Sequence, residues 1–325
     1  MKKTLAFAIL TLLFWQQPGF AQTPTATSSQ PLTIIVPFAA GGSTDILARL
    51  IGDHLQSELQ RAVVIQNVGG AGSMIGLSRL AKAKPDGSTI GIGTSAGMVI
   101  NPLIKPRTVP YKPQSDFLPI TRFTESYQVL VVNPAKVPVA NIPELISYLK
   151  AHPKEVTFGS PGIGTNQQVA AEMLQVLTKT AMVHIPYTGS AQVSTDLVGG
   201  QIDLAFDQVP QLMPYIKSGQ LRVLGYTGPE SPSFDRSIPP IGSLVKGFSM
   251  IGWHGVFAPA RTPDAVVQQY ADIISKFMAR PDTVAKFDSL GVIAASTSRQ
   301  DFSRFLAADI ERTRPVVDKA GMIEP

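Results

Sequence analysis

The chain has 325 residues, of which 44% are hydrophobic and 16% charged, so it holds enough apolar material for two packed domains. It contains 27 glycines and 27 prolines but no cysteine, which excludes disulfides, thiolate metal sites and a catalytic thiol. The formal net charge is +5, and the basic residues are scattered rather than gathered in a stripe, so we expect no nucleic-acid partner.

The N-terminus has the pattern of a secretory signal peptide. Lys2 and Lys3 precede the apolar run Leu5–Trp15, and the small residues Gly19 and Ala21 stand where a signal peptidase needs them. The alternative is a retained membrane anchor, but the apolar run is short for a span and no later run reaches about 18 residues. The sequence predicts a signal peptide of residues 1–21, cleaved after Ala21, and an exported, soluble mature chain.

The first part of the mature chain alternates short β-branched runs with amphipathic segments. Ile46 to Leu59 carries apolar residues at helical spacing, and Pro85-Asp86-Gly87 is a turn. The other expected elements are strands Leu32–Pro37, Val63–Gln66 and Thr89–Gly93 and helix Met74–Ala83. This βαβαβ order predicts a parallel sheet.

The same alternation recurs later in the chain. The expected elements are strands Val156–Gly159, Val183–Pro186, Gln201–Phe206 and Leu221–Tyr226 and helices Gln167–Leu177, Ala191–Val198 and Gln211–Lys217. Two extended stretches, Tyr127–Val132 and Gly252–Pro259, flank this unit and read as crossovers. Helices Asp264–Phe277 and Asp301–Asp318 then pack back on the first unit. We therefore expect domain 1 to comprise residues 22–125 and 252–325, with domain 2, residues 126–251, inserted between them.

Three strand-to-helix junctions share one design, in which glycines follow a strand and a small polar residue opens a helix. They run from Pro37 to Asp45, from Gly69 to Gly76 and from Phe158 to Thr165. Free backbone N–H groups at a helix start favour an anion, so the junctions predict carboxylate or phosphate binding. The alternative is that the glycines only permit tight turns. Thr165 with Gln168 also fits a capping box.

Cofactor and metal motifs are missing from the sequence. Gly70, Gly72 and Gly76 do not have the spacing of a dinucleotide fingerprint, and no acidic residue ends the next strand to hold a ribose. The four histidines are isolated, without the spacing of metal ligands. We expect neither a cofactor nor a metal.

Gly93-Thr94-Ser95-Ala96-Gly97 matches the G-x-S-x-G pattern of a secreted α/β-hydrolase, in which Ser95 would be the nucleophile. That fold needs a helix directly after the serine, and Asn101-Pro102 and Pro106 argue against one. The possible bases are better explained as surface or core residues: His152, His184 and His254. An esterase remains the alternative function, and a structural or adhesive exported protein is a third.

Several separate motifs, in order along nearly the whole mature chain, resemble the tripartite tricarboxylate transporter substrate-binding proteins, also called Bug receptors. The matching segments are Ile34 to Asp45, Gly70-Ala71-Gly72 with Ile75-Gly76, Pro85-Asp86-Gly87, Asp116-Phe117, Phe158-Gly159-Ser160 through Gly164-Thr165, Ile185-Pro186-Tyr187, Asp196 to Asp203, Trp253 with Gly255, and Thr262-Pro263.

The resemblance implies an α/β fold of the two-domain periplasmic-binding-protein type, a type II clamshell in which each domain is a mainly parallel sheet flanked by helices. Such a receptor captures a small carboxylate between its lobes, in the periplasm, without catalytic residues or a cofactor. Its partners would be the membrane permease subunits of a tripartite tricarboxylate transporter or a sensor protein, and we expect a monomer. The implied ligand-binding residues are Phe38, Ala40, Gly41, Gly42, Thr44, Asp45, Ser73, Ser95, Ser160, Gly164, Thr165 and Asp207.

Two departures from the family pattern bear on ligand identity. Many relatives carry His-Leu where this chain has Gln168-Val169, and often Lys where it has Thr188. Both differences remove positive charge near the second lobe, so the ligand of a relative does not transfer directly to this chain.

Overall fold

The structure is a computed structural model that describes residues 30–38, 40–187, 189–232 and 234–324. The predicted signal peptide and its cleavage site lie outside the described residues, as does Thr188. Among the helices that these residues form, none is both long and apolar enough to cross a lipid bilayer.

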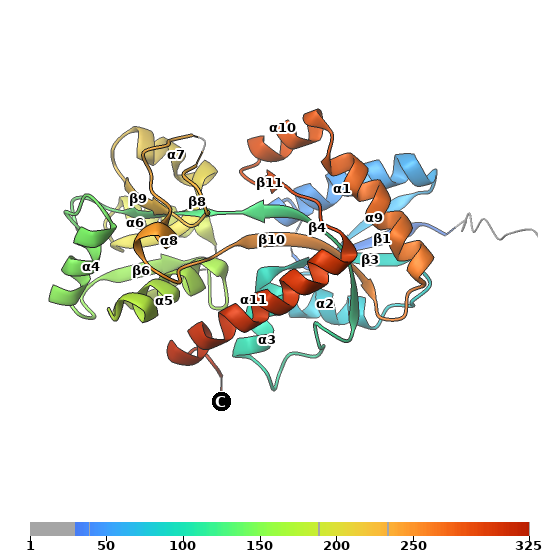
Figure 1. Cartoon of the computed structure of the whole chain (residues 1–325), viewed down its shortest axis with the longest axis horizontal. Coiled ribbons are helices and arrows are strands. Elements are labelled where there is room, and N and C mark those ends of the chain that lie inside the picture. The colour runs from blue at the N-terminus through green and yellow to red at the C-terminus, as the bar shows by residue number, and fades with distance from the viewer. Residues whose placement is uncertain (1–29, 39, 188, 233, 325) are drawn as a thin grey trace, which may run out of the picture.

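The strands form two sheets that lie beside each other along the long axis of the molecule (Figure 1). The first sheet has the order β11-β4-β10-β3-β1-β2. Its strands are β1 (Leu32–Val36), β2 (Val63–Asn67), β3 (Thr89–Thr94), β4 (Phe117–Ser126), β10 (Gly252–Pro259) and β11 (Ile293–Ala294). The second sheet has the order β7-β6-β8-β5-β9. Its strands are β5 (Gln128–Val132), β6 (Thr157–Ser160), β7 (Val183–Pro186), β8 (Leu204–Gln208) and β9 (Arg222–Tyr226).

Each sheet mixes parallel and antiparallel neighbours. In the first sheet β1 runs parallel to β2 and β3, whereas β10 is antiparallel to β3 and β4, and β11 to β4. In the second sheet β6 runs parallel to β7 and β8, whereas β5 is antiparallel to β8 and β9. The expectation of mainly parallel sheets is therefore too simple. Every antiparallel pair contains β4, β5 or β10, which are the strands at the two points where the chain passes between the sheets.

Helices cover both faces of each sheet, as alternating α/β sequences require. The helices of the first sheet are α1 (Ser43–Leu59), α2 (Met74–Ala81), α3 (Asn101–Ile104), α9 (Asp264–Met278), α10 (Pro281–Ser289) and α11 (Arg299–Lys319). Those of the second sheet are α4 (Ile142–Ala151), α5 (Asn166–Thr178), α6 (Ser190–Val198), α7 (Val209–Lys217) and α8 (Ile241–Leu244).

One apolar core continues from the first sheet into the second. It includes Leu77 of α2, Trp253 of β10, Phe302 of α11 and Phe158 of β6, all of them buried. A second core lies between the first sheet and helices α1 and α9, and a third lies between the second sheet and helices α6 and α7. Helix α11 packs against both β4 and α5, and this places the last long helix at the junction of the two sheets (Figure 1).

Most of the expected elements are present, with ends that differ by a few residues. The stretch Gly252–Pro259 is strand β10 as expected. The largest error concerns the segment after Ser95. A π-helix, Ala96–Ile100, begins directly after this serine and continues into α3, although we expected the prolines to prevent a helix. Pro102 lies near the start of α3, inside this continuous helical run, and does not end it.

Candidate functional site

The first junction, before α1, is held by the side chain of Asp45. Its Oδ2 atom accepts hydrogen bonds from the Gly41 backbone N–H at 2.9 Å and from Arg49 Nε at 2.9 Å, and its Oδ1 atom accepts one from Asn67 Nδ2 at 3.0 Å. Asp45 is 2% exposed. Burial opposes ionisation, but these hydrogen bonds outweigh it and lower the pKa of Asp45 below its ordinary value. Both oxygens of Asp45 thus shape the junction itself and are already occupied.

The rest of the first junction lies around this carboxylate. The backbone carbonyl of Phe38 accepts a hydrogen bond from Asn67 Nδ2 at 3.2 Å, and the ring packs half-buried against the core under α1. Ala40, Gly41 and Gly42 are exposed, and Gly42 precedes the first residue of α1 without a side-chain cap. This edge of the loop is therefore open to a ligand.

Thr44 connects the first junction to the crossover strands. Its Oγ1 lies 3.2 Å from His254 Nε2, and the other ring nitrogen of His254 lies 2.8 Å from Thr124 Oγ1. All three side chains are buried, and burial lowers the pKa of His254 to about 4. A neutral imidazole therefore joins the start of α1 to both β10 and β4.

In the third junction, before α5, hydrogen bonds from protein side chains hold the loop. Ser160 Oγ lies 2.6 Å from His184 Nε2 and donates to the Gly162 carbonyl at 3.0 Å. Thr165 caps α5 by accepting from the Gln168 N–H, which confirms half of the predicted capping box. The other half differs, because Gln168 Oε1 accepts from the Gly164 N–H at 2.9 Å.

The expectation of free backbone amides is therefore wrong at two positions. The Gly41 N–H is used by Asp45 and the Gly164 N–H by Gln168. Both acceptors sit four residues further along the chain, on the first turn of the helix that the junction opens. In each case a polar side chain from the first turn of the helix accepts a hydrogen bond from a backbone N–H group that would otherwise be available to an anion.

Ser95 and Asn166 join the two sheets by a direct polar contact. Ser95 Oγ lies 2.9 Å from Asn166 Oδ1 and 2.7 Å from Asn166 Nδ2. Ser95 follows β3 of the first sheet, and Asn166 is the first residue of α5 on the second. Among the hydrogen bonds of the described residues, none links Ser95 to a histidine.

Asn101 makes a second connection between the junctions. Its Nδ2 donates to the Gly72 carbonyl at 2.6 Å, and a Cβ added at Gly164 would lie only 2.6 Å from Asn101 Oδ1. Gly164 also has φ +78°, a conformation that favours glycine. The second and third junctions therefore meet across this one asparagine, and glycine is required at Gly164 by both space and backbone conformation.

Ser73 is the buried polar group of the second junction. It is 1% exposed, it adopts a left-handed backbone with φ +79°, and its hydroxyl has no hydrogen-bond partner among the described residues. A Cβ on Gly97 would come within 2.3 Å of this hydroxyl, so glycine allows the close approach. Buried hydroxyls without a partner are uncommon, so Ser73 stands out among the polar residues of the three junctions.

Asp207, at the end of β8, is the most buried acid of the predicted set. It is 1% exposed, and Oδ1 accepts hydrogen bonds from Gln208 N, Gln167 Nε2 and Ser190 Oγ at 2.8, 3.3 and 3.1 Å. Oδ2 has no partner among the described residues. Burial raises the pKa of Asp207 against the opposing effect of these hydrogen bonds. Gln167 follows Asn166 directly, so Asp207 lies close to the contact that joins the sheets.

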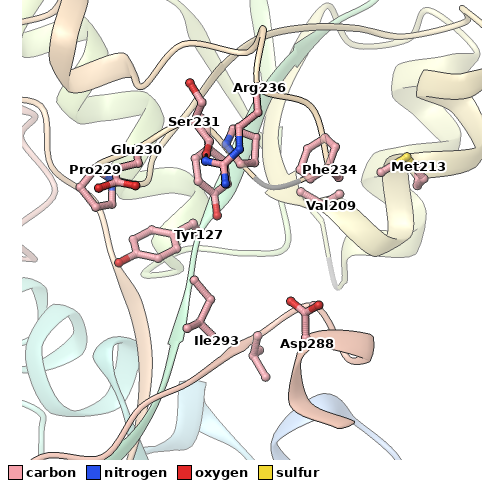
Figure 2. A pocket seen from close by; sticks show the side chains of 14 residues that line it. Tyr127, Val209, Met213, Pro229, Glu230, Ser231, Phe234, Arg236, Asp288 and Ile293 are labelled. Atoms are coloured by element: carbon pink, nitrogen blue, oxygen red, sulfur yellow. Dashed lines mark hydrogen bonds between the residues drawn. The ribbon is translucent and has the colours of Figure 1, made fainter. Parts of the chain in front are cut away.

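A pocket of about 510 Å³ lies between parts of the two sheets (Figure 2). It is lined by Tyr127, by Val209 and Met213 of α7, by Tyr226 of β9, by residues 229–232, 234 and 236, and by Asp288 and residues 291–293. None of the twelve predicted ligand-binding residues lines it. Within the described part of the chain, no group of three acidic or histidine side chains is placed to hold a metal ion.

Sequence reasoning missed the side chains that organise the junctions. They are Asn67, Asn101, Asn166, Gln167 and Ser190. Only the three consecutive side-chain amides after Thr165, from Asn166 to Gln168, stand out as a signal, because side-chain amides at a helix start often form hydrogen bonds to backbone groups. The others depend on residues that are remote in the chain.

Comparison with known proteins identifies the family. The model described as "Tripartite tricarboxylate transporter family receptor" matches residues 47–322. BugT of Bordetella pertussis is 30% identical over 324 residues, covering 99% of each chain. The R. palustris protein Rpa4515, solved with adipate, is 31% identical with a TM-score of 0.79, covering 91% of this chain and 98% of that one. MatC from Rhodopseudomonas palustris, solved with bound malate, is 26% identical with a TM-score of 0.75, covering 89% and 99%.

These similarities confirm the predicted resemblance and the periplasmic-binding-protein fold. The family consists of substrate-binding receptors rather than enzymes. The chain belongs to the tripartite tricarboxylate transporter receptor family.

Proposed function

We propose that this receptor captures a small carboxylate in a cleft between two lobes. The lobes are residues 22–125 with 252–325, and residues 126–251. The chain is exported to the periplasm after cleavage behind Ala21, acts as a monomer, and presents its ligand to the permease subunits of a tripartite transporter or to a sensor protein. Two structural neighbours were solved with carboxylates, adipate and malate, which supports this ligand class.

The observation that supports the proposal most strongly is that the glycine-containing junctions contact one another where the two sheets adjoin. Ser95 contacts Asn166, and Asn101 lies between Gly72 and Gly164, so the second and third junctions face each other. The first junction adjoins them, because a Cβ on Gly76 would lie 2.7 Å from Pro37 Cα. The site would be formed by Phe38, Ala40, Gly41, Gly42, Thr44, Asp45, Ser73, Ser95, Ser160, Gly164, Thr165 and Asp207.

Within this set the residues have different tasks. Asp45, Thr44 and Ser160 position the junctions, since their polar atoms are bonded to protein groups. The exposed backbone N–H groups of Ala40 and Gly42 and the unpartnered Ser73 hydroxyl supply donors for a carboxylate. Asp207 Oδ2, which has no hydrogen-bond partner among the described residues, accepts a hydrogen bond from a hydroxyl or cationic group of the ligand.

The mechanism is closure of the two lobes around the ligand. The ligand binds the donors of one lobe, and contacts with the other lobe then favour the closed state by the difference in affinity for the two states. Solution scattering of the mature chain, with and without each of a set of carboxylates, tests this mechanism. A smaller radius of gyration with a bound carboxylate is expected. Unchanged scattering at a concentration where calorimetry shows binding would contradict closure.

A further inference from the structure

The pocket between the sheets is lined by apolar and aromatic side chains from both of them. Tyr127 and Tyr226 form one wall, with their ring centroids 5.6 Å apart. Val209 and Met213 of α7 form another, together with Phe234, and Ile293 faces them from the first sheet (Figure 2). Phe234 is 40% exposed and Ile293 is 47% exposed, so both present apolar surface to the cavity without a protein partner that covers them.

The charges of the pocket are unfavourable for a compact polyanion. Arg236 is its single cationic side chain, and it donates one hydrogen bond to the Ser231 carbonyl. Glu230 and Asp288 also line the pocket, Asp288 from the end of α10 (Figure 2). Two carboxylates and one guanidinium, all three exposed, give the lining a net charge of −1, which favours at most one anionic group, opposite Arg236.

The pocket lies at the same edge of the second sheet as Asp207. Val129 of β5 pairs with Asp207 on one side and with Tyr226 on the other, so these residues stand in one row across three strands. Neighbouring strands are about 4.8 Å apart, which places the backbones of Asp207 and Tyr226 about 10 Å from each other. Val209, which lines the pocket, is only two residues beyond Asp207. A ligand whose carboxylate is bound at the junctions and whose body passes Asp207 would therefore need several carbons to reach the tyrosines.

We propose that this pocket receives the apolar body of the ligand, an inference that rests on the receptor function proposed above. The ligand is then a carboxylic acid with a ring or a chain of several carbons, with at most one further carboxylate. Glu230 and Asp288 disfavour a compact tricarboxylate such as citrate. The junctions recognise the carboxylate that all such acids share, and the pocket selects the length and hydrophobicity of the remainder.

The test is a calorimetric titration of the mature chain with a homologous series of probes: acetate, butyrate, hexanoate, octanoate and 3-phenylpropionate, with citrate as the polyanionic probe. A buried methylene contributes about 0.8 kcal/mol, so affinity should rise about fourfold for each carbon that enters the pocket. Phe234→Ala should flatten this rise and weaken hexanoate and 3-phenylpropionate about tenfold, without changing butyrate. Met213→Trp, which fills the cavity, should reject the longer acids and keep the short ones.

Leu244→Ala is the matched control, since Leu244 is also an exposed apolar side chain, 48% exposed, but lies outside this pocket. It should leave the whole series unchanged. Acids that bind with equal affinity at every length, or a chain-length dependence that both pocket variants retain, would overturn the pocket proposal while leaving the receptor function intact. Citrate binding more tightly than hexanoate would also overturn it. Failure of all carboxylates to bind ligand-free protein would instead contradict the receptor function itself.

Discussion

Substitution of Asp45 tests whether the first junction depends on a single carboxylate. The carboxylate receives three hydrogen bonds, from Gly41 N, Arg49 Nε and Asn67 Nδ2, and is 2% exposed. Asp45→Asn keeps the shape of the side chain but turns an NH₂ group toward one of these donors. A hydrogen bond to a charged group contributes about 1.5 to 3 kcal/mol, and the half-exposed Arg49 favours the lower end. We expect a loss of about 2 kcal/mol for Asn and about 4 kcal/mol for Ala.

Urea denaturation at pH 7 measures the loss, and its pH dependence identifies the cause. Because the pKa of Asp45 is lowered in the folded protein, the advantage of the wild type over Asp45→Asn is complete above the pKa of the unfolded chain. It should shrink as the pH falls through the lower pKa of the folded state. Asp282→Asn is the control, since this exposed aspartate is likewise hydrogen-bonded to an arginine, Arg280, and its loss should leave the urea midpoint unchanged.

Asp45→Asn should also weaken carboxylate binding, because the open backbone of residues 40–42 depends on the loop that Asp45 closes. Equal stability of the variant and the wild type would refute the assigned role of the three hydrogen bonds. A destabilised variant that binds carboxylates as tightly as the wild type would show that the first junction is not part of the ligand site.

Three further substitutions and pH effects follow from the structure. Burial lowers the pKa of His254 and of His184 to about 4, so the unfolded chain binds more protons between about pH 6.5 and 4. The free energy of unfolding, measured with urea, should therefore fall on acidification through this range by up to about 1.4 kcal/mol per pH unit for each histidine, and a flat profile would contradict this. Gly164→Ala should lower the free energy of unfolding by about 2 kcal/mol more than Gly41→Ala does. Both glycines have positive φ, but only the Cβ added at Gly164 meets other atoms. Equal urea midpoints of the two variants would disprove the clash. Ser95→Ala should weaken carboxylate binding several-fold, by about 1 kcal/mol, and leave ester hydrolysis at the background rate; loss of a measurable esterase activity would contradict the receptor assignment.

The strands and helices that were predicted from the sequence are those whose apolar residues recur at a regular spacing. Strand β4 was missed because its residues do not alternate. Ile120, Thr121, Phe123 and Thr124 are all buried, since helices cover both faces of the strand. Pro119 lies in this strand next to a register irregularity between β4 and β10.

Helix α4 carries clear start signals that periodicity alone did not bring out. Asn141 caps it by accepting from the Glu144 N–H, and Pro143 stands in its first turn. Start signals therefore deserve the same weight as apolar spacing when elements are assigned from sequence.

The junctions were predictable from the sequence, but their hydrogen bonding was not. A run of glycines before a helix predicts where an anion can approach, and three such runs were recognised. Which of their amides are already used depends on side chains such as Asp45 and Gln168, while the link between junctions depends on Ser95 and Asn166, 71 positions apart. Contacts of this kind arise only when the two sheets are placed side by side.

The measurement that tests the central claim most directly is thermal unfolding of the mature chain against a panel of small carboxylates. A ligand that binds only the folded state adds about 2.7 kcal/mol of stability at one hundred times its dissociation constant. The account predicts a concentration-dependent rise in the unfolding temperature with at least one carboxylate, and loss of that rise in Asp45→Asn. No rise with any carboxylate, together with no small acid released from the denatured protein in mass spectrometry, would contradict it.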